Sequence, residues 1–362
     1  MKLNRFLQSA LFSCLLTAGV VQANTLRVNN IANLVAGVDG YVTLAAAVAA
    51  ADNGDTIHIE GSVTPYTGNV TIDKKVVIIG PGYFLGSTPE TQYNKETAKL
   101  DCDIVFGNGS DGSVLAGVEQ RTGGASYQVN TAAYAGNKII IQADNISVIS
   151  CKLFYVGVDV SQNRNNINVQ KCFFNPGVVT TSGSGAGVIA NLSVSNCFFR
   201  NDYTGRLVIN SPVGTTSGWR ISQCTFYSSF SVAAINTVFS NNAFFGTGTI
   251  TSNSTNGYNN NVMNTNVATG SITDGVNGNT IRTEAVGLWF SQAGADVATD
   301  IYFAAASGST CPLRDGSAEK GMYGGGMPYV ASGMFSIPSV YDIQMDAEVG
   351  DSFDMVIRAR TH

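Results

Sequence analysis

The best candidates for catalytic residues in this sequence are a few charged side chains. Residues 140–270 contain no Glu, and their only Asp residues are Asp144, Asp159 in GVDV, and Asp202. Arg200 and Arg206 flank Asp202, and Arg206, in GRLVIN, could act as a base beside a carboxylate. Hydrolysis of a glycosidic bond normally uses two carboxyl groups that face each other across a cleft. If longer turns bring Asp159, Asp202 and Arg206 into one groove, they could act on a sugar. The alternative is that all three are solvated turn residues, because structural ion pairs often resemble sites.

Other catalytic and metal-binding arrangements are not expected. His58 alternates with Ile57 and Ile59 and so points out of its strand, and His362 is the last residue. Two such histidines do not favour a Ser-His-Asp triad, a Cys-His pair or a histidine metal site. Asp101 and Asp103 share one face of a strand and could suit a cation, but the alternative is two solvated carboxylates. We predict no metal and no cofactor.

Aromatic residues could instead bind a sugar by stacking. Pairs of Phe stand at residues 173–174, 198–199 and 244–245. Alternation turns one Phe of each pair into the core, so packing explains at least half of them. Tyr155, Tyr203 and Tyr227 are better candidates for exposed stacking rings, and the alternative is that each is an ordinary surface tyrosine.

These residues belong to a repeat. Five segments share one template, in which two alternating apolar positions and two further residues precede a Cys or Asn and then an aromatic residue. A sixth copy, around Tyr258, is degraded. The Cys or Asn stands at residues 151, 172, 197, 224, 242 and 261, with spacings of 21, 25, 27, 18 and 19. Leucine-rich repeats and propeller blades keep a tighter period and other signatures. The scatter favours a parallel β-helix, whose strands must stack but whose loops vary in length.

Stacking explains the template physically. One coil cannot bury its own apolar face, whereas coils stacked about 4.8 Å apart bury it continuously. Further strands are predicted upstream around Ile57, Ile72, Ile78, Ile104 and Ile140. Residues 40–285 have room for roughly 10 coils at the usual repeat lengths of solenoids. The fold class is therefore all-β, with an N-terminal capping helix after Thr43 and a C-terminal cap.

The cysteines are expected to be stacked thiols. Without Cys14, six remain, and an even number in an exported protein usually suggests disulfides. In-register side chains on neighbouring coils point in parallel, whereas a disulfide needs converging Cβ atoms about 3.8 Å apart. We therefore predict buried thiols that pack as small apolar groups.

The ends of the chain predict export and three regions. Residues 1–23 have a positive start, an apolar stretch too short to span a bilayer and a Val-Gln-Ala ending, which together indicate a signal peptide. Lipidation of Cys14 is the alternative. We expect the β-helix with its N-terminal cap over residues 24–300, and closing strands over residues 301–362. The protein would be secreted or attached to the cell surface, or would stay in the periplasm.

Composition narrows the partners. The net charge is −5 and only 12% of the residues are charged, about half the usual share. Such a chain has no electrostatic footprint for nucleic acid, and no later apolar run is long enough to cross a membrane. A polysaccharide is the expected partner, and the oligomeric state is not predicted.

Two segments resemble the opening of pectate-lyase-like right-handed β-helix proteins. They are TLAAAVAAADNGDTIHIEGSV and TIDKKVVIIGPG, and the tail GMYGGGMPYVASGMFSIPSVYDI is similar to the closing segment of exported bacterial members. The resemblance implies the right-handed coil over nearly all of the mature chain. It implies little about activity, because the family includes lyases, hydrolases and proteins without known catalysis. The Asn-Thr-Asp, Asp-Asp, Gly-His-Gly and Arg-Ile-Lys motifs of its polygalacturonase-like hydrolases do not occur here.

Two functions follow as hypotheses. The first is an exported, non-catalytic scaffold that binds glycan along its flank, since small polar side chains on a flat sheet suit an extended polymer. The second is a polysaccharide lyase or glycoside hydrolase with an atypical site near Asp159, Asp202 and Arg206, and it depends on analogy of fold.

Overall fold

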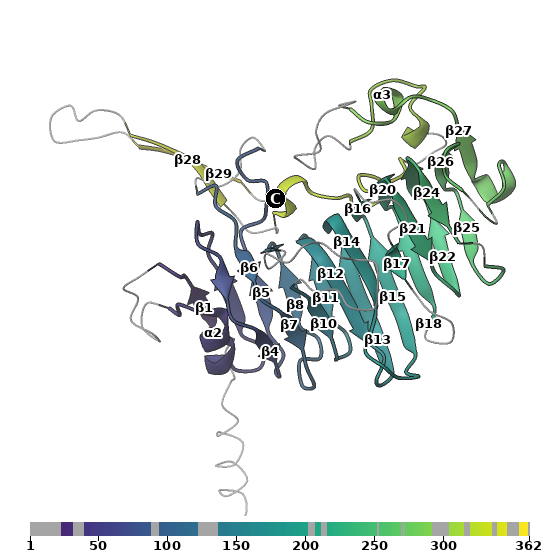
Figure 1. Cartoon of the computed structure of the whole chain (residues 1–362). Helices are drawn as coiled ribbons and strands as arrows, with labels where there is room; N and C mark the ends of the chain where they lie inside the picture. The colour runs from purple at the N-terminus through teal and green to yellow at the C-terminus, as the bar shows by residue number, and fades with distance from the viewer. Residues whose placement is uncertain are drawn as a thin grey trace, which may run out of the picture.

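The chain is mostly β-strand, and its short strands stack in parallel along one axis (Figure 1). The computed structural model describes residues 23–31, 40–87, 94–121, 137–201, 207–210, 216–251, 253–268, 270, 272–291, 304–314, 319–334, 339–345 and 355–360. Its long parallel sheets confirm the predicted all-β class and identify a parallel β-solenoid. Residues 1–22 of the predicted signal peptide lie outside the described part.

The first sheet forms one face of the solenoid. Its strands follow one another in the order β1 (Thr25–Val28), β2 (Thr56–Ile59), β5 (Val77–Ile79), β8 (Val114–Ala116), β11 (Ser147–Ile149), β13 (Arg164–Gln170), β15 (Ile189–Ser195), β19 (Trp219–Ser222), β22 (Thr237–Ser240) and β25 (Gly257–Asn259), with β18 (Thr216–Ser217) beside β15. All these pairs are parallel and lack a register shift. Each strand therefore adds its side chains to the same columns.

The second sheet contains two series of strands. The aromatic series is β3 (Tyr66–Thr67), β6 (Lys99–Asp101), β9 (Glu119–Gln120), β16 (Phe198–Asn201), β20 (Thr225–Ser228), β23 (Ala243–Phe245), β26 (Val262–Asn264) and β27 (Thr280–Arg282). The aliphatic series is β4 (Val70–Ile72), β7 (Ile104–Phe106), β10 (Ile139–Ile141), β17 (Leu207–Asn210), β21 (Phe230–Ala233) and β24 (Gly248–Ile250). The long strands β12 (Lys152–Asp159) and β14 (Phe173–Ser182) pair with both series and join them into one sheet.

The interior is built from columns of like residues. On the aromatic series, the rings of Phe174, Phe199, Phe226 and Phe244 stack with centroids 4.8, 5.0 and 4.6 Å apart. All four are fully buried, and so are the Ile and Val residues of the template. One coil thus covers the apolar face of the next, as the repeat predicts.

The predicted cysteine column is confirmed. The residues that follow Cys151, Cys172, Cys197 and Cys224 pair with one another in register, and the Cys172 backbone N–H donates to Cys197 Sγ at 3.4 Å. All six cysteines of the described part are buried and free. Their parallel stacking keeps the sulfur atoms from converging, which agrees with the expected thiols.

Asparagines continue this column toward the C-terminal end. The Cys224 backbone N–H donates to Asn242 Oδ1 at 2.8 Å, and the Nδ2 groups of Asn242 and Asn261 each donate to the next Asn Oδ1 at 3.0 Å. The last member is Asn279, which the template did not identify. Because these side chains are buried, every amide that finds a partner avoids a large desolvation penalty.

A left-handed residue precedes each column member. Ser150, Lys171, Asn196, Gln223, Asn241 and Asn260 have φ angles of 51–55°. This conformation turns the chain from the first sheet to the aromatic series within two residues. Asn tolerates it best, whereas the other residue types are strained there.

A short helix lies at the β1 end. In α2 (Leu44–Ala50) the Thr43 hydroxyl accepts from the Ala46 N–H at 3.2 Å, as expected for an N-cap. Its buried residues Leu44, Ala47 and Val48 face the solenoid, and the helix contacts β1, β2 and β4. No helix in the described part of the chain is long and apolar enough to cross a membrane.

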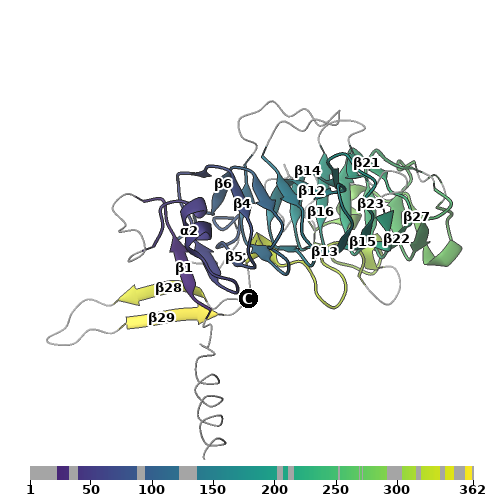
Figure 2. The ribbon, with the colours of Figure 1, turned by 90° about the horizontal axis from the view of Figure 1, so that it is seen from below.

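The C-terminal segment, defined here as residues 304–314 and 319–334, runs back along the solenoid rather than continuing its coils. Near one end, the Asn196 amide donates to the carbonyls of Met322 and Gly324 at 3.0 and 2.8 Å. At the other end, the Tyr83 N–H donates to Ser332 O at 2.8 Å. The antiparallel hairpin of β28 (Ser339–Met345) and β29 (Met355–Arg360) then projects beyond the β1 end (Figure 2). The boundaries 24–300 and 301–362 stay predictions.

Candidate functional site

Asp159 organises the turn that follows β12. Its carboxylate accepts from the Ser161 backbone N–H at 2.6 Å and from Gln142 Nε2 at 2.8 Å, and the side chain is buried. Burial alone raises the pKa of Asp159, but these hydrogen bonds and the charge of Arg164 outweigh it and hold the pKa below its ordinary value. Gly183, with φ of 77°, lies against the carboxylate, and a Cβ there would be 3.1 Å from Oδ1. Asp159 is therefore an ionised, fully engaged carboxylate.

The other two members of the predicted catalytic set, Asp202 and Arg206, lie outside the described residues. Of the three residues, only Asp159 lies within the described part of the chain. Its contacts with Ser161 and Gln142 are those of a turn residue.

The candidate stacking tyrosines differ in their surroundings. Tyr155 lies across Gly157 on β12, where a Cβ would be 2.6 Å from the ring carbon Cε1, and burial raises the pKa of its phenol. Tyr227 is packed against Phe245 and Phe290, with ring centroids 5.8 and 5.7 Å away. Tyr203 lies outside the described residues. Tyr227 thus belongs to a packed aromatic cluster, while Tyr155 lies flat on the sheet.

The outward Phe residues of the aromatic series are covered. Phe173 and Phe198 stack at 4.6 Å and are fully buried, although they point away from the solenoid interior. They form a second core with apolar residues of the C-terminal segment, among them Leu313, Met322 and Tyr329. Alternation required only that one Phe of each pair point outward. Because the C-terminal segment covers Phe173 and Phe198, these two rings cannot form a sugar-stacking strip.

Asp101 and Asp103 are tied to the next coil. Asp101 Oδ1 accepts from Asn137 Nδ2, and Asp103 Oδ1 accepts from the Lys138 N–H, both at 2.7 Å. Burial, together with these two carboxylates, raises the pKa of Cys102 to about 12. In the described ranges, no group of three or more His, Cys, Asp or Glu residues could hold a metal ion.

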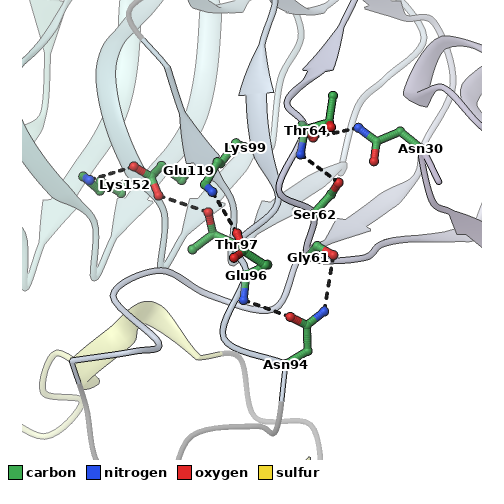
Figure 3. Close-up of polar contacts among 10 residues, drawn as sticks. All are labelled: Asn30, Gly61, Ser62, Thr64, Asn94, Glu96, Thr97, Lys99, Glu119 and Lys152. Atoms are coloured by element: carbon green, nitrogen blue, oxygen red, sulfur yellow. Dashed lines mark hydrogen bonds and ion pairs between the residues drawn. The ribbon is translucent and has the colours of Figure 1, made fainter.

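Charged side chains gather on β9, on β12 and around the start of β6, and they neutralise one another (Figure 3). Lys152 Nζ lies 2.7 Å from Glu119 Oε1, and the Thr97 hydroxyl donates to Glu119 Oε2 at 3.1 Å. Lys99 Nζ lies 2.9 Å from Glu96 Oε2. Lys152 also lies 4.7 Å from the centroid of the Phe84 ring. These contacts join neighbouring coils and leave little unpaired charge for a ligand.

The outward face of the first sheet offers polar groups that the protein does not use. We call its straight row of side chains from β13 to β25 the polar column, and its members are Gln170, Ser195, Ser222, Ser240 and Asn259. All five are at least partly exposed, and within the described part of the chain no hydrogen bond engages their side chains. By contrast, the neighbouring exposed amides of Asn145, Asn166 and Asn191 bond to one another. Stacking repeats the hydroxyls about every 4.8 Å.

Sequence reasoning did not select the polar column, although its signal is present. Each member is the second outward residue of a template segment, two places before the Cys or Asn. Comparing outward positions between coils would have found it, because only the inward positions define the repeat.

Comparisons with known proteins add no relative. A scan against models of protein families finds no match, and neither a search of curated proteins nor one of solved structures finds any. The description of the chain as a parallel β-solenoid protein with a flat polar face therefore depends on its structure alone.

Proposed function

We propose that this chain is an exported, non-catalytic scaffold that binds an extended glycan along the polar column. In this proposal the solenoid is a right-handed parallel β-helix of roughly 10 coils, as the resemblance to pectate-lyase-like proteins implies. Residues 1–23 direct export, and the mature protein resides on the cell surface, in the periplasm or in the medium.

The observation behind this proposal is that the side-chain hydroxyl and amide groups of the polar column make no hydrogen bonds within the described part of the chain. A glycan chain presents hydroxyl groups that both donate and accept, and Ser, Asn and Gln side chains do the same. Each such bond contributes only about 1 kcal/mol against competing water. A row of them along a rigid sheet adds up for a polymer but not for a single sugar, so the expected ligand is extended and uncharged or weakly charged.

The state of Asp159 favours a scaffold over an enzyme. A general acid must keep its proton near the working pH, and an effective base needs a pKa near that pH. The hydrogen bonds from Ser161 and Gln142 lower the pKa of Asp159 and occupy its oxygens. The alternative, a polysaccharide lyase or glycoside hydrolase, then depends on Asp202 and Arg206.

Glycan binding by the protein purified from an exporting host tests the proposal. We expect affinity for an extended polysaccharide, measured on an array and by titration, and no unsaturated products or new reducing ends. The triple variant Ser195→Ala, Ser222→Ala, Ser240→Ala should bind more than about tenfold more weakly. A matched control is Ser231→Ala with Thr249→Ala, which removes two outward hydroxyls of the aliphatic series. Equal glycan binding by the triple variant and the control would refute the polar column as the binding site. Turnover of a polysaccharide that Asp159→Asn abolishes would favour the alternative, an enzyme.

A further inference from the structure

Arg164 is a buried cation without a partner. It begins β13 and pairs in register with the buried Ile189 of β15. Only 7% of its surface is exposed, and its Nε is enclosed and has no hydrogen-bond partner. No ion pair or side-chain hydrogen bond engages the guanidinium anywhere in the structure that is described.

The enclosed Nε of Arg164 is costly to leave without an acceptor. Taking a cation out of water costs several kcal/mol unless an anion or good acceptors replace the lost hydration. Asp159 is near enough for its carboxylate to feel the charge of Arg164, yet the two do not form an ion pair. Its oxygens already accept from Ser161 and Gln142.

A second unsatisfied polar group lies at the same corner. Ser182 pairs in register with Asp159, and its enclosed Oγ has no hydrogen-bond partner. Water could satisfy a hydroxyl, but it would not neutralise a guanidinium. Planar guanidinium groups bind oxyanions through two parallel N–H···O bonds, and a neighbouring hydroxyl can donate a third bond.

We propose that Arg164, together with Ser182, binds a small oxyanion such as sulfate or phosphate at the corner between β12 and β13. The oxyanion neutralises the guanidinium and accepts the Ser182 hydroxyl, and it is either free in solution or an ester group of a glycan. This site is separate from the polar column and does not depend on it. The Asp159 carboxylate opposes the anion and makes the affinity moderate.

Titration of the whole purified protein with defined anions tests the site. Calorimetry and the melting temperature are measured with sodium sulfate, with sodium phosphate, and with dextran sulfate against uncharged dextran. Sodium chloride at equal ionic strength is the reference. We expect saturable binding that Arg164→Lys weakens about tenfold or more, because lysine keeps the charge but loses the two parallel bonds.

Arg220→Lys is the matched control, because Arg220 is an exposed arginine of the same sheet. Saturation by free sulfate or phosphate would identify a free ion, and saturation by dextran sulfate alone would identify a glycan ester. Absence of saturable binding by the wild-type protein would overturn the proposal, and so would equal weakening by both lysine variants. If Arg164→Lys does not fold, Ser182→Ala should still weaken the binding seen with the wild type.

Discussion

Removing one amide from the asparagine column should greatly destabilise the C-terminal coils. The side chain of Asn261 donates to Phe239 O at 3.1 Å and to Asn279 Oδ1 at 3.0 Å. Its Oδ1 accepts from the backbone N–H and the Nδ2 of Asn242, both at 3.0 Å. Asn261→Ala removes all four bonds in a fully buried place. At about 1 kcal/mol for each bond, we expect the free energy of unfolding to fall by about 4 kcal/mol.

Two variants separate this effect from simple loss of a side chain. Asn261→Cys places in the column the residue that occupies it in the upstream coils, where Cys197 Sγ donates to Ser195 O at 3.2 Å. It should lose less stability than Asn261→Ala. Asn166→Gly removes an amide from the exposed row, and its φ of 56° suits glycine. That variant should change stability by less than about 1 kcal/mol.

Denaturant unfolding and hydrogen exchange resolved by peptide measure these effects. In Asn261→Ala, exchange should accelerate first in β22, β25 and β26, because a solenoid couples mainly neighbouring coils. The reasoning is refuted if Asn261→Ala loses less than about 1 kcal/mol, or if Asn166→Gly loses as much.

Three further predictions concern the cover, the thiols and pH. Gly333→Ala should release the C-terminal segment, because at φ of 55° its Cβ would be 2.2 Å from a ring carbon of Tyr83. Limited proteolysis should show the release, and Gly326→Ala, which meets nothing within 4 Å, should not show it. The native protein should not react with thiol reagents at mildly alkaline pH, because burial raises the pKa of the thiols at Cys151, Cys172 and Cys197. After denaturation without reductant, all its thiols should react. Finally, Asp159→Asn should be less stable than the wild type at neutral pH. The folded-state pKa of Asp159 lies below its ordinary value, so its contribution is complete above that ordinary value and is lost as pH falls through the folded pKa. The stability difference should therefore close in acid, and a difference independent of pH would contradict this account.

The core of this protein could be predicted from local patterns. Alternation of apolar residues identified the inward positions, and recurrence of Cys151, Cys172, Cys197 and Cys224 identified one column. The same pattern placed Thr43 at the start of a helix, because an N-cap is a local signal. It did not extend the column to Asn279, where no aromatic residue follows the Asn.

The candidate sites were less predictable. Asp159 was selected for its residue type, but its hydrogen bonds to Ser161 and Gln142 give it the role of a turn residue. Arg164 was not singled out, because nothing in the sequence distinguishes a paired arginine from an unpaired one. The polar column was visible in the sequence only as small residues at outward positions.

The sequence alone determined which residues face inward and that the coils stack, since period-two alternation and the repeat are properties of the chain itself. Only the tertiary structure decided what lies against the outward residues. Tyr83 and Tyr329 are 246 residues apart, and their hydroxyl groups bond to each other. No local pattern encodes such a contact, so the burial of Phe173 and Phe198 and the isolation of Arg164 depend on how distant segments pack.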